Sequence, residues 1–390
     1  MRVLVMATPS PTHFTPMVPM LWALRAAGHD VLVVCQPDDL AAVASAGLNA
    51  TCIGEAFDGE GFLLRGLEGK RPLQARPRES FKVWGYGRVW AGQSERVVDA
   101  YLAFTRDHRP DLILSDPLDY AALIVGGVLG VPVVQHRWGV DPFSADARKE
   151  ARIALQHVCD RLGIAELPEP AELFDPCPPS LQLPDAAPGT PIRAVPFNGN
   201  GQLPLWLRQS ATAPRGVRRV AFTLGGTLPL NGVPLARDVL TALGAISDVE
   251  VIATVDERFR AELGEVPDSV RLVDPLPLHL LFGSCDAAVH HGGSGTTMTA
   301  TGFGLPQLVL PQLADHFAHG DRLAELGAGI TFDTARSQEQ GDRLREALVE
   351  LLEVPGYAKA AAALSREMAD MPAPSRVVAD LERGWADRAH

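Results

Sequence analysis

Short apolar runs alternate with longer, partly polar runs along the first half of the chain, and this alternation limits the fold more than any other feature. The apolar runs span residues 3–7, 31–35, 112–115 and 131–135. Strands buried on both faces read as continuous apolar runs, and parallel strands need a crossover between them, usually a helix. The pattern therefore predicts a parallel sheet with helices on both faces.

The same alternation starts again near residue 217. Further strands are predicted at 217–224, 249–255, 270–273, 286–290 and 307–310, and helices at 234–243, 295–302, 316–326 and 338–352. A chain of 390 residues also exceeds the usual size of a single hydrophobic core. The sequence thus predicts two similar α/β domains with a cleft between them.

The region between the two halves, 184–215, is rich in Pro, Gly, Asn and Ala and lacks a clear period, which is typical of a linker. We predict an N-terminal domain of residues 1–197, a linker of 198–216 and a C-terminal domain of 217–373. A final helix within 374–390 is expected to cross back to the N-terminal domain.

Two local features of the first domain are predicted in more detail. Thr15 is expected to N-cap a helix that starts at Pro16 and ends at Gly28. The irregular stretch 56–78 is expected to form a long mobile loop, and such loops in compact domains are often functional.

Composition excludes several classes of protein. A net charge of −12 without a Lys/Arg run argues against binding to nucleic acid or anionic membranes. Five scattered cysteines suggest neither a disulfide framework nor a zinc site. The first apolar run is too short for a signal peptide, and no run has membrane-spanning length. We therefore expect a cytoplasmic protein, with a homodimer left open.

The segment 289–297, Val-His-His-Gly-Gly-Ser-Gly-Thr-Thr, follows a predicted strand and opens a predicted helix. Its glycines let the backbone approach a ligand, and free N–H groups at a helix start favour an anion. A bare turn is the alternative, but the histidines and hydroxyls favour a diphosphate site. No Walker loop is present, and Pro-Ser-Pro-Thr-His at 9–13 replaces a dinucleotide fingerprint.

These motifs carry a resemblance to a known family. The segment 290–297, with Gly-Leu-Pro-Gln at 304–307 and Pro-Gln-Leu-Ala-Asp-His at 311–316, resembles the donor signature of family 1 glycosyltransferases, in particular the antibiotic-decorating branch that uses TDP-deoxysugars. The segments 136–142 and 175–180 are similar to polyketide glycosyltransferases of the spinosyn rhamnosyltransferase type. The resemblance covers the whole chain and implies the GT-B fold, two Rossmann-like domains whose parallel sheets face an interdomain cleft.

The resemblance also implies roles for individual residues on the donor side. The diphosphate contacts would be His291, Gly293, Ser294, Gly295, Thr296 and Thr227, the nucleoside contacts Thr223, Pro275 and Leu276, and the sugar contacts Asp315 and His316. Many relatives carry Gln where this chain has His316. Thr299 stands where UDP-using relatives carry a ribose-binding Glu, which is consistent with TDP.

His13 follows the first predicted strand, where the carboxyl ends of parallel strands meet the crevice. An imidazole titrates near neutrality and accepts a proton from an acceptor hydroxyl; the resemblance makes His13 the general base. Asp116, at the end of the strand 112–115, is expected to orient it, although Asp116 equally suits the N-cap of the next helix. Trp84 and Trp138 are predicted acceptor contacts, with core packing as the alternative.

The predicted reaction is inverting transfer of a deoxysugar, first of all L-rhamnose, from a TDP-sugar to an apolar polyketide or macrolide aglycone in antibiotic biosynthesis. No Asp-x-Asp pair occurs, so we expect metal-independent catalysis without a cofactor. The alternatives are C-glycosylation of an aromatic polyketide, a non-catalytic auxiliary protein, which should lack His13 or the phosphate turn, and a sugar-nucleotide epimerase.

Overall fold

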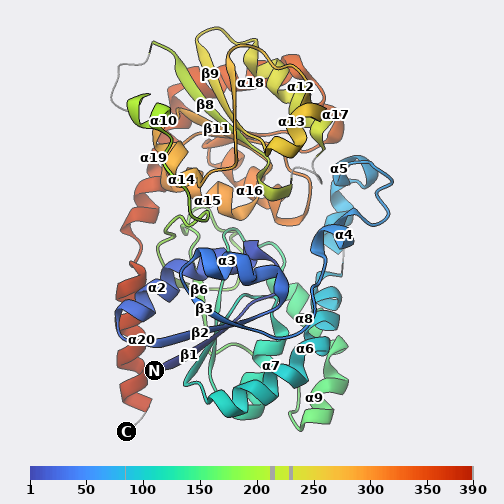
Figure 1. Ribbon diagram of the computed structural model, residues 1–390, viewed down its shortest axis with the longest axis vertical. Helices are drawn as coiled ribbons and strands as arrows, with labels where there is room; N and C mark the ends of the chain where they lie inside the picture. The colour runs from blue at the N-terminus through green and yellow to red at the C-terminus, as the bar shows by residue number, and fades with distance from the viewer. Residues whose placement is uncertain (84, 211–215, 228–231, 389–390) are drawn as a thin grey trace.

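Two parallel sheets, one in each half of the chain, organise the molecule (Figure 1). The computed structural model describes every residue except 84, 211–215, 228–231 and 389–390. The first sheet has the strand order β3-β2-β1-β4-β5-β6-β7 and the second β10-β9-β8-β11-β12-β13. All of these neighbouring strands pair in parallel. The predicted class, α/β with two parallel sheets, is therefore confirmed.

Every predicted strand is present, with its ends moved by two residues or fewer. The strands are β1 (Arg2–Met6), β2 (Asp30–Cys35), β3 (Asn49–Cys52), β4 (Leu112–Ser115), β5 (Val133–His136), β6 (Glu172–Asp175), β7 (Thr190–Pro191), β8 (Arg218–Thr223), β9 (Val249–Thr254), β10 (Val270–Val273), β11 (Ala287–His290), β12 (Gln307–Val309) and β13 (Gly329–Thr331). The sequence did not predict β3, β6, β7 and β13. Three of these are edge strands, which are short and less apolar because one side faces solvent.

Helices cover both faces of each sheet. The longer ones are α2 (Val18–Ala26), α6 (Tyr86–His108), α7 (Tyr120–Leu129), α8 (Ser144–Ala154), α12 (Val233–Gly244), α15 (Ser294–Gly302), α16 (Ala314–Glu325), α18 (Gly341–Glu353), α19 (Pro355–Asp370) and α20 (Pro374–Arg388). The alternation along β1 shows how the core is divided. Leu4 packs in a cluster with α6 and α7, while Val3 packs in a cluster with α2 and α20.

The first helix begins earlier than predicted, and Thr15 is not its N-cap. A helical segment starts with α1 (Pro11–Phe14), continues as the 3-10 turn η1 (Thr15–Met17) and then becomes α2. The interruption has a physical cause, because Pro16 lacks an N–H and cannot donate to a carbonyl four residues earlier. The end is as predicted, with Gly28 at a φ of +89° just after α2. His13 therefore lies on a short helix and not on a loop.

The stretch 56–78 is not the simple loop that the sequence predicted. It contains α4 (Gly59–Leu64) and α5 (Pro72–Ala75), and η3 (Arg78–Val83) follows. Figure 1 shows α4 and α5 rising from the first domain to the side of the second. The predicted linker region is also partly regular, since α10 (Leu205–Ser210) lies within it.

The last helix belongs to the core of the first domain. Val377 and Val378 of α20 are buried in the same cluster as residues of β1 and α2, and Figure 1 shows α20 running along that domain. A second apolar cluster joins the domains, with Val140 and Leu181 packed beside Met298. The boundaries at 197, 216 and 373 stay predictions. None of the helices in the described residues is long and apolar enough to span a membrane.

Candidate active site

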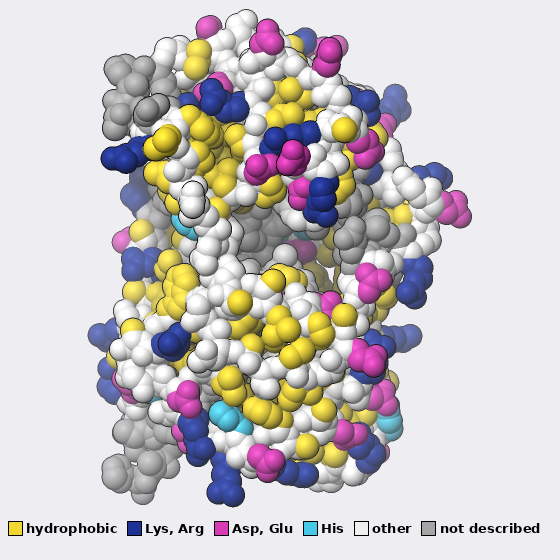
Figure 2. Space-filling view, in the orientation of Figure 1, with side chains coloured by type: hydrophobic (Ala, Val, Ile, Leu, Met, Phe, Trp, Pro, Cys, Tyr) yellow, Lys and Arg dark blue, Asp and Glu magenta, His cyan; other side chains and the backbone are white. Residues whose placement is uncertain are grey.

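The carboxyl ends of the two sheets meet between the domains. In the first sheet β1 and β4 are neighbours, and Met6 is paired with Ser115 at their ends. In the second sheet β8 and β11 are neighbours, and Thr223 is paired with His290. The loop after β5 contacts α16 of the other domain, and Figure 2 shows a hollow between the two lobes. Ligands of open parallel sheets bind beyond these strand ends, so this hollow is the candidate site.

His13 and Asp116 are brought together as the sequence analysis expected. Nδ1 of His13 lies 3.1 Å from Oδ1 of Asp116 and 2.5 Å from Oγ1 of Thr8. Asp116 is fully buried, whereas the side chain of His13 is 18% exposed. Because the carboxylate can only accept, the ring proton is assigned to Nδ1, and Nε2 carries the free lone pair. This pair is therefore suited to take a proton at Nε2.

Asp116 has several other donors, and the capping role falls to a different residue. The N–H of Thr8 donates to Oδ2 of Asp116 at 2.8 Å, and the N–H of Leu118 donates to Oδ1 at 3.0 Å. The N-cap of α7 is Asp119, whose side chain accepts from the N–H of Ala122 at 3.0 Å. Burial, with the charge of Asp116 second, raises the pKa of Asp119 to about 7. Asp116 is therefore not the N-cap of α7, and its carboxylate is positioned beside His13.

The predicted acceptor contacts have different outcomes. Trp138 is buried, and its ring centroid lies 4.7 Å from that of His13. Trp90, on α6, also packs near His13, with the two ring centroids 5.7 Å apart. Phe57 packs on Trp90, with their ring centroids 5.2 Å apart. Trp84 lies outside the described residues. Aromatic rings therefore surround the base, and Trp138 supports His13 directly.

The glycine turn after β11 opens α15, as the sequence predicted. The N-cap of α15 is Gly293, which has no side-chain cap, so the first N–H groups of the helix are not used by a capping residue. Ser294 is half-buried, Gly295 exposed and Thr296 buried. The turn is fixed from behind by His290, whose Nδ1 accepts from the N–H of Gly292 at 3.0 Å. The arrangement favours an anion at the start of α15.

His291 lies between two glycine turns that leave room for its ring. A Cβ on Gly225 would lie 2.9 Å from the ring, and a Cβ on Gly293 would overlap it. Burial first, and the neighbouring His290 second, lower the pKa of His291 to about 3, while a backbone hydrogen bond with Thr223 acts in the opposite direction. His291 is therefore neutral near pH 7 and has a single N–H, so it donates to a phosphate only when that N–H is not donated to the backbone of Thr223.

The remaining predicted nucleotide contacts also follow strand ends of the second sheet. The hydroxyl of Thr223 accepts from the N–H of Gly225 at 3.1 Å, so it shapes the turn η4 (Gly225–Thr227). The side chain of Thr227 lies outside the described part of the chain. Pro275 is exposed and Leu276 half-buried, both just after β10. Since β10 lies two strands away from β8, these residues extend the site along the sheet edge.

Asp315 and His316 begin α16 and face the same region. The ring of His316 meets that of His291 edge-on at 4.9 Å and is buried, so His316 supports the turn more than it faces the hollow. Burial raises the pKa of Asp315 to about 6, the charge of His13 lowers it, and the charge of Asp141 raises it. Asp315 lies one turn before His319, whose ring accepts a hydrogen bond from the loop after β5 of the other domain.

Sequence reasoning missed the residues that tie the two domains together beside the site. Arg71 donates to Oε1 of Gln338 at 2.7 Å and pairs with Glu339 at 3.0 Å. Arg78 pairs with Asp333 at 2.7 Å and also with Asp321. A signal was present, because both arginines lie in the irregular stretch 56–78, and long loops in compact domains are often functional. Their partners are more than 200 residues away, which no local pattern reveals.

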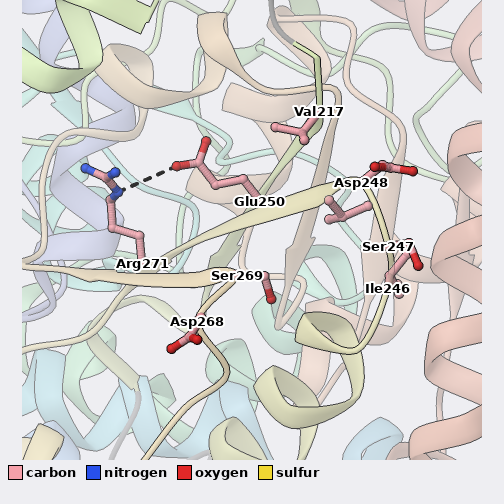
Figure 3. A pocket seen from close by; sticks show the side chains of 9 residues that line it. Val217, Ile246, Ser247, Asp248, Glu250, Asp268, Ser269 and Arg271 are labelled. Atoms are coloured by element: carbon pink, nitrogen blue, oxygen red, sulfur yellow. Dashed lines mark ion pairs between the residues drawn. The ribbon is translucent and has the colours of Figure 1, made fainter.

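A pocket of about 440 Å³ lies elsewhere, at the amino ends of β8, β9 and β10 (Figure 3). Asp248, Glu250, Asp268 and Arg271 are among its lining residues. Nε of Arg271 lies 3.5 Å from Oε1 of Glu250, so the cation of this pocket is already paired. The pocket is at the opposite edge of the sheet from the glycine turns, so we do not assign it to the reaction.

Comparison with known proteins identifies the family of the chain. The chain matches the erythromycin biosynthesis protein CIII-like N-terminal domain over residues 22–225 and the corresponding C-terminal domain over residues 237–383. It is 36% identical to the L-demethylnoviosyl transferase of Streptomyces niveus, over 99% of this chain and 98% of that protein. It is 32% identical to the aclacinomycin-T 2-deoxy-L-fucose transferase of Streptomyces galilaeus, over 99% and 97%.

Solved structures give the same result. Spinosyn rhamnosyltransferase SpnG matches with a TM-score of 0.87 at 37% identity, over 98% of this chain and 100% of that one. Its complexes with thymidine diphosphate and with spinosyn aglycone match with TM-scores of 0.85 and 0.84, both at 36% identity and the same coverage. With its two facing parallel sheets, the chain belongs to the erythromycin biosynthesis protein CIII-like family of antibiotic glycosyltransferases and has the GT-B fold.

Proposed function

We propose that the protein transfers a deoxysugar from a TDP-sugar to a hydroxyl group of a polyketide aglycone, with inversion at the anomeric carbon. The observation that carries this proposal is the His13–Asp116 pair beyond the carboxyl ends of β1 and β4, a buried carboxylate 3.1 Å from a partly exposed imidazole. L-Rhamnose is the first sugar to test, because the solved structure of SpnG, a rhamnosyltransferase, matches over the whole chain.

The chemistry is a single displacement. Nε2 of His13 takes the proton of the acceptor hydroxyl as its oxygen forms a bond to the anomeric carbon. The bond from that carbon to the diphosphate oxygen breaks, and its electron pair leaves with TDP. Asp116 stabilises the imidazolium that forms, through the 3.1 Å contact at Nδ1.

The leaving group needs a stabilising environment, and the start of α15 offers one. Negative charge grows on the diphosphate as it departs, and preorganised N–H donors stabilise such charge without reorganising. The donors proposed here are the N–H groups of Ser294, Gly295 and Thr296, together with the ring of His291. The rings of Trp138 and Trp90 around His13 favour an apolar acceptor beside the base.

The deciding experiment offers the purified protein a panel of TDP- and UDP-sugars with macrolide and aromatic aglycones, with products identified by mass spectrometry. We expect glycosylated product from a TDP-deoxysugar. His13→Ala should abolish transfer while TDP still binds in calorimetry, and His291→Ala should weaken TDP binding. A His13→Ala protein that keeps most of its turnover would remove His13 from the mechanism.

The same assay tests two further parts of the proposal. We propose that transfer needs no metal or cofactor, since helix N–H groups take the charge-stabilising role, so a chelator should leave the rate unchanged. A rate restored only by added magnesium would overturn this. A TDP-sugar converted without any acceptor would indicate an epimerase instead.

A further inference from the structure

His319, on α16, is a fully buried histidine for which the reaction described above has no role. Its Nδ1 lies 2.8 Å from the carbonyl oxygen of Asp315, and its Nε2 lies 3.2 Å from the N–H of Val140. A carbonyl can only accept and an amide N–H can only donate. The proton is therefore on Nδ1, and Nε2 is the acceptor.

The contact with Val140 crosses from one domain to the other. The backbone approaches so closely that a Cβ on Gly139 would lie 2.8 Å from Nε2 of His319. A glycine at this position is thus a condition for the contact. Burial lowers the pKa of His319 to about 4, so the ring remains neutral and Nε2 remains an acceptor near pH 7.

The loop that His319 holds is rigid on its own side as well. Arg137 is buried and forms ion pairs with Asp141 at 2.8 Å and with Asp175 at 2.7 Å. The side-chain amide of Gln182 donates to the carbonyl of Gly139 at 3.2 Å. A displacement at Val140 would therefore move the loop as a unit, because neighbouring positions are fixed to each other.

Each end of this connection leads to a residue of the proposed reaction. Trp138, two residues before Val140, packs on the ring of His13. The carbonyl oxygen that accepts from Nδ1 belongs to Asp315, whose side-chain carboxylate is the one proposed to bind the donor sugar. His319 thus touches no reacting atom itself. It connects the loop that carries Trp138, which packs on the base, to the helix that carries Asp315.

We propose that His319 is a positioning residue that sets the distance between the base on one domain and the sugar-binding carboxylate on the other, through its hydrogen bonds to Val140 and Asp315. This inference rests on the proposed function for its effect on the reaction. Its structural part, the coupling of the loop 136–141 to α16, does not.

Two substitutions separate the two ring nitrogens. An Asn side chain ends near the position of Nδ1, so His319→Asn keeps a donor for the Asp315 carbonyl and loses the acceptor for Val140. A Gln side chain reaches the position of Nε2, so His319→Gln keeps that acceptor. His157→Asn, at an exposed histidine of the first domain, is the matched control.

The first measurement is hydrogen exchange followed by mass spectrometry, with and without TDP, and it needs no acceptor. In His319→Asn, the peptide containing Val140 should exchange at least about tenfold faster than in wild type, while His319→Gln and the control resemble wild type. Gly139→Ala should disrupt the same contact from the first domain, and the peptide containing Val140 should again exchange faster than in wild type. The test therefore does not depend on the folding of a single variant.

The second measurement is transfer itself, with the donor and acceptor pair found above. His319→Asn should lower kcat about 10- to 100-fold, because a small misplacement of reacting groups costs that much, while TDP affinity is unchanged. His319→Gln should restore most of the rate. Unaltered exchange at Val140 in both His319→Asn and Gly139→Ala would overturn the inference. Altered exchange with no transfer by any protein, wild type included, would count against the proposed function alone.

Discussion

Asp39 allows a prediction whose size can be worked out from the structure. It ends η2 (Pro37–Asp39), is fully buried, and neither carboxylate oxygen has a hydrogen-bond partner among the described residues. Burial first, then the charges of Asp116, Asp38 and Asp119, raises the pKa of Asp39 to about 8 from its ordinary value of 3.8. In the folded protein this carboxyl group therefore stays protonated near pH 7.

The direction of the pH effect follows from proton linkage. A group whose pKa is raised on folding contributes stability that is complete below 3.8 and is lost as the pH rises towards 8. Asn cannot ionise, so Asp39→Asn does not suffer this loss. Each pH unit corresponds to about 1.4 kcal/mol, so the stability of the variant relative to wild type should grow by about 3 kcal/mol between about pH 5.5 and pH 8.

Urea unfolding at several pH values, followed by tryptophan fluorescence, measures this difference. Four of the six tryptophans lie in the first 197 residues, so the signal reports mainly on the domain that contains Asp39. Groups that titrate independently of Asp39 cancel in the comparison. Asp107→Asn, at an exposed carboxylate of the same domain, controls for the change in net charge. Parallel pH profiles for Asp39→Asn and wild type would refute the reasoning.

Three other perturbations test the site and its frame. Asp116→Asn should lower the transfer rate by about 10²- to 10⁴-fold without changing TDP affinity, since it removes the charge behind the base; a rate within a few-fold of wild type would contradict this. Gly293→Ala should weaken TDP binding in calorimetry, because the added Cβ overlaps the ring of His291; an unchanged dissociation constant would place the diphosphate elsewhere. Arg71→Met removes the hydrogen bond to Gln338 and the ion pair with Glu339. Faster hydrogen exchange in residues 57–80 is expected, and unchanged exchange would show that this arginine does not hold the segment.

Local pattern was enough to predict the class of fold. Strands in the middle of each sheet are buried on both faces, and their continuous apolar runs place β1, β4, β8 and β11 within a residue or so of their observed ends. The edge strands β3, β7 and β13 and the internal strand β6 lack that pattern and were not predicted. The single helix expected after Thr15 was wrong in its start, because the prolines at 16 and 19 act on hydrogen bonds that begin further back along the chain.

The sequence by itself determined the two α/β halves and the glycine turn after β11, because strands, turns and helix starts depend on neighbours a few residues away. It also marked His13 as a base and Asp116 as the carboxylate that orients it, but not the contact between them. Their contact spans 103 residues and exists because β1 and β4 are adjacent in the sheet. Only the tertiary structure gave the cap of α7 to Asp119, joined Arg71 to the second domain, and brought His319 to the backbone of Val140. Such contacts depend on how strands and domains pack. The spacing of two residues along the chain does not determine whether they are close in the folded protein.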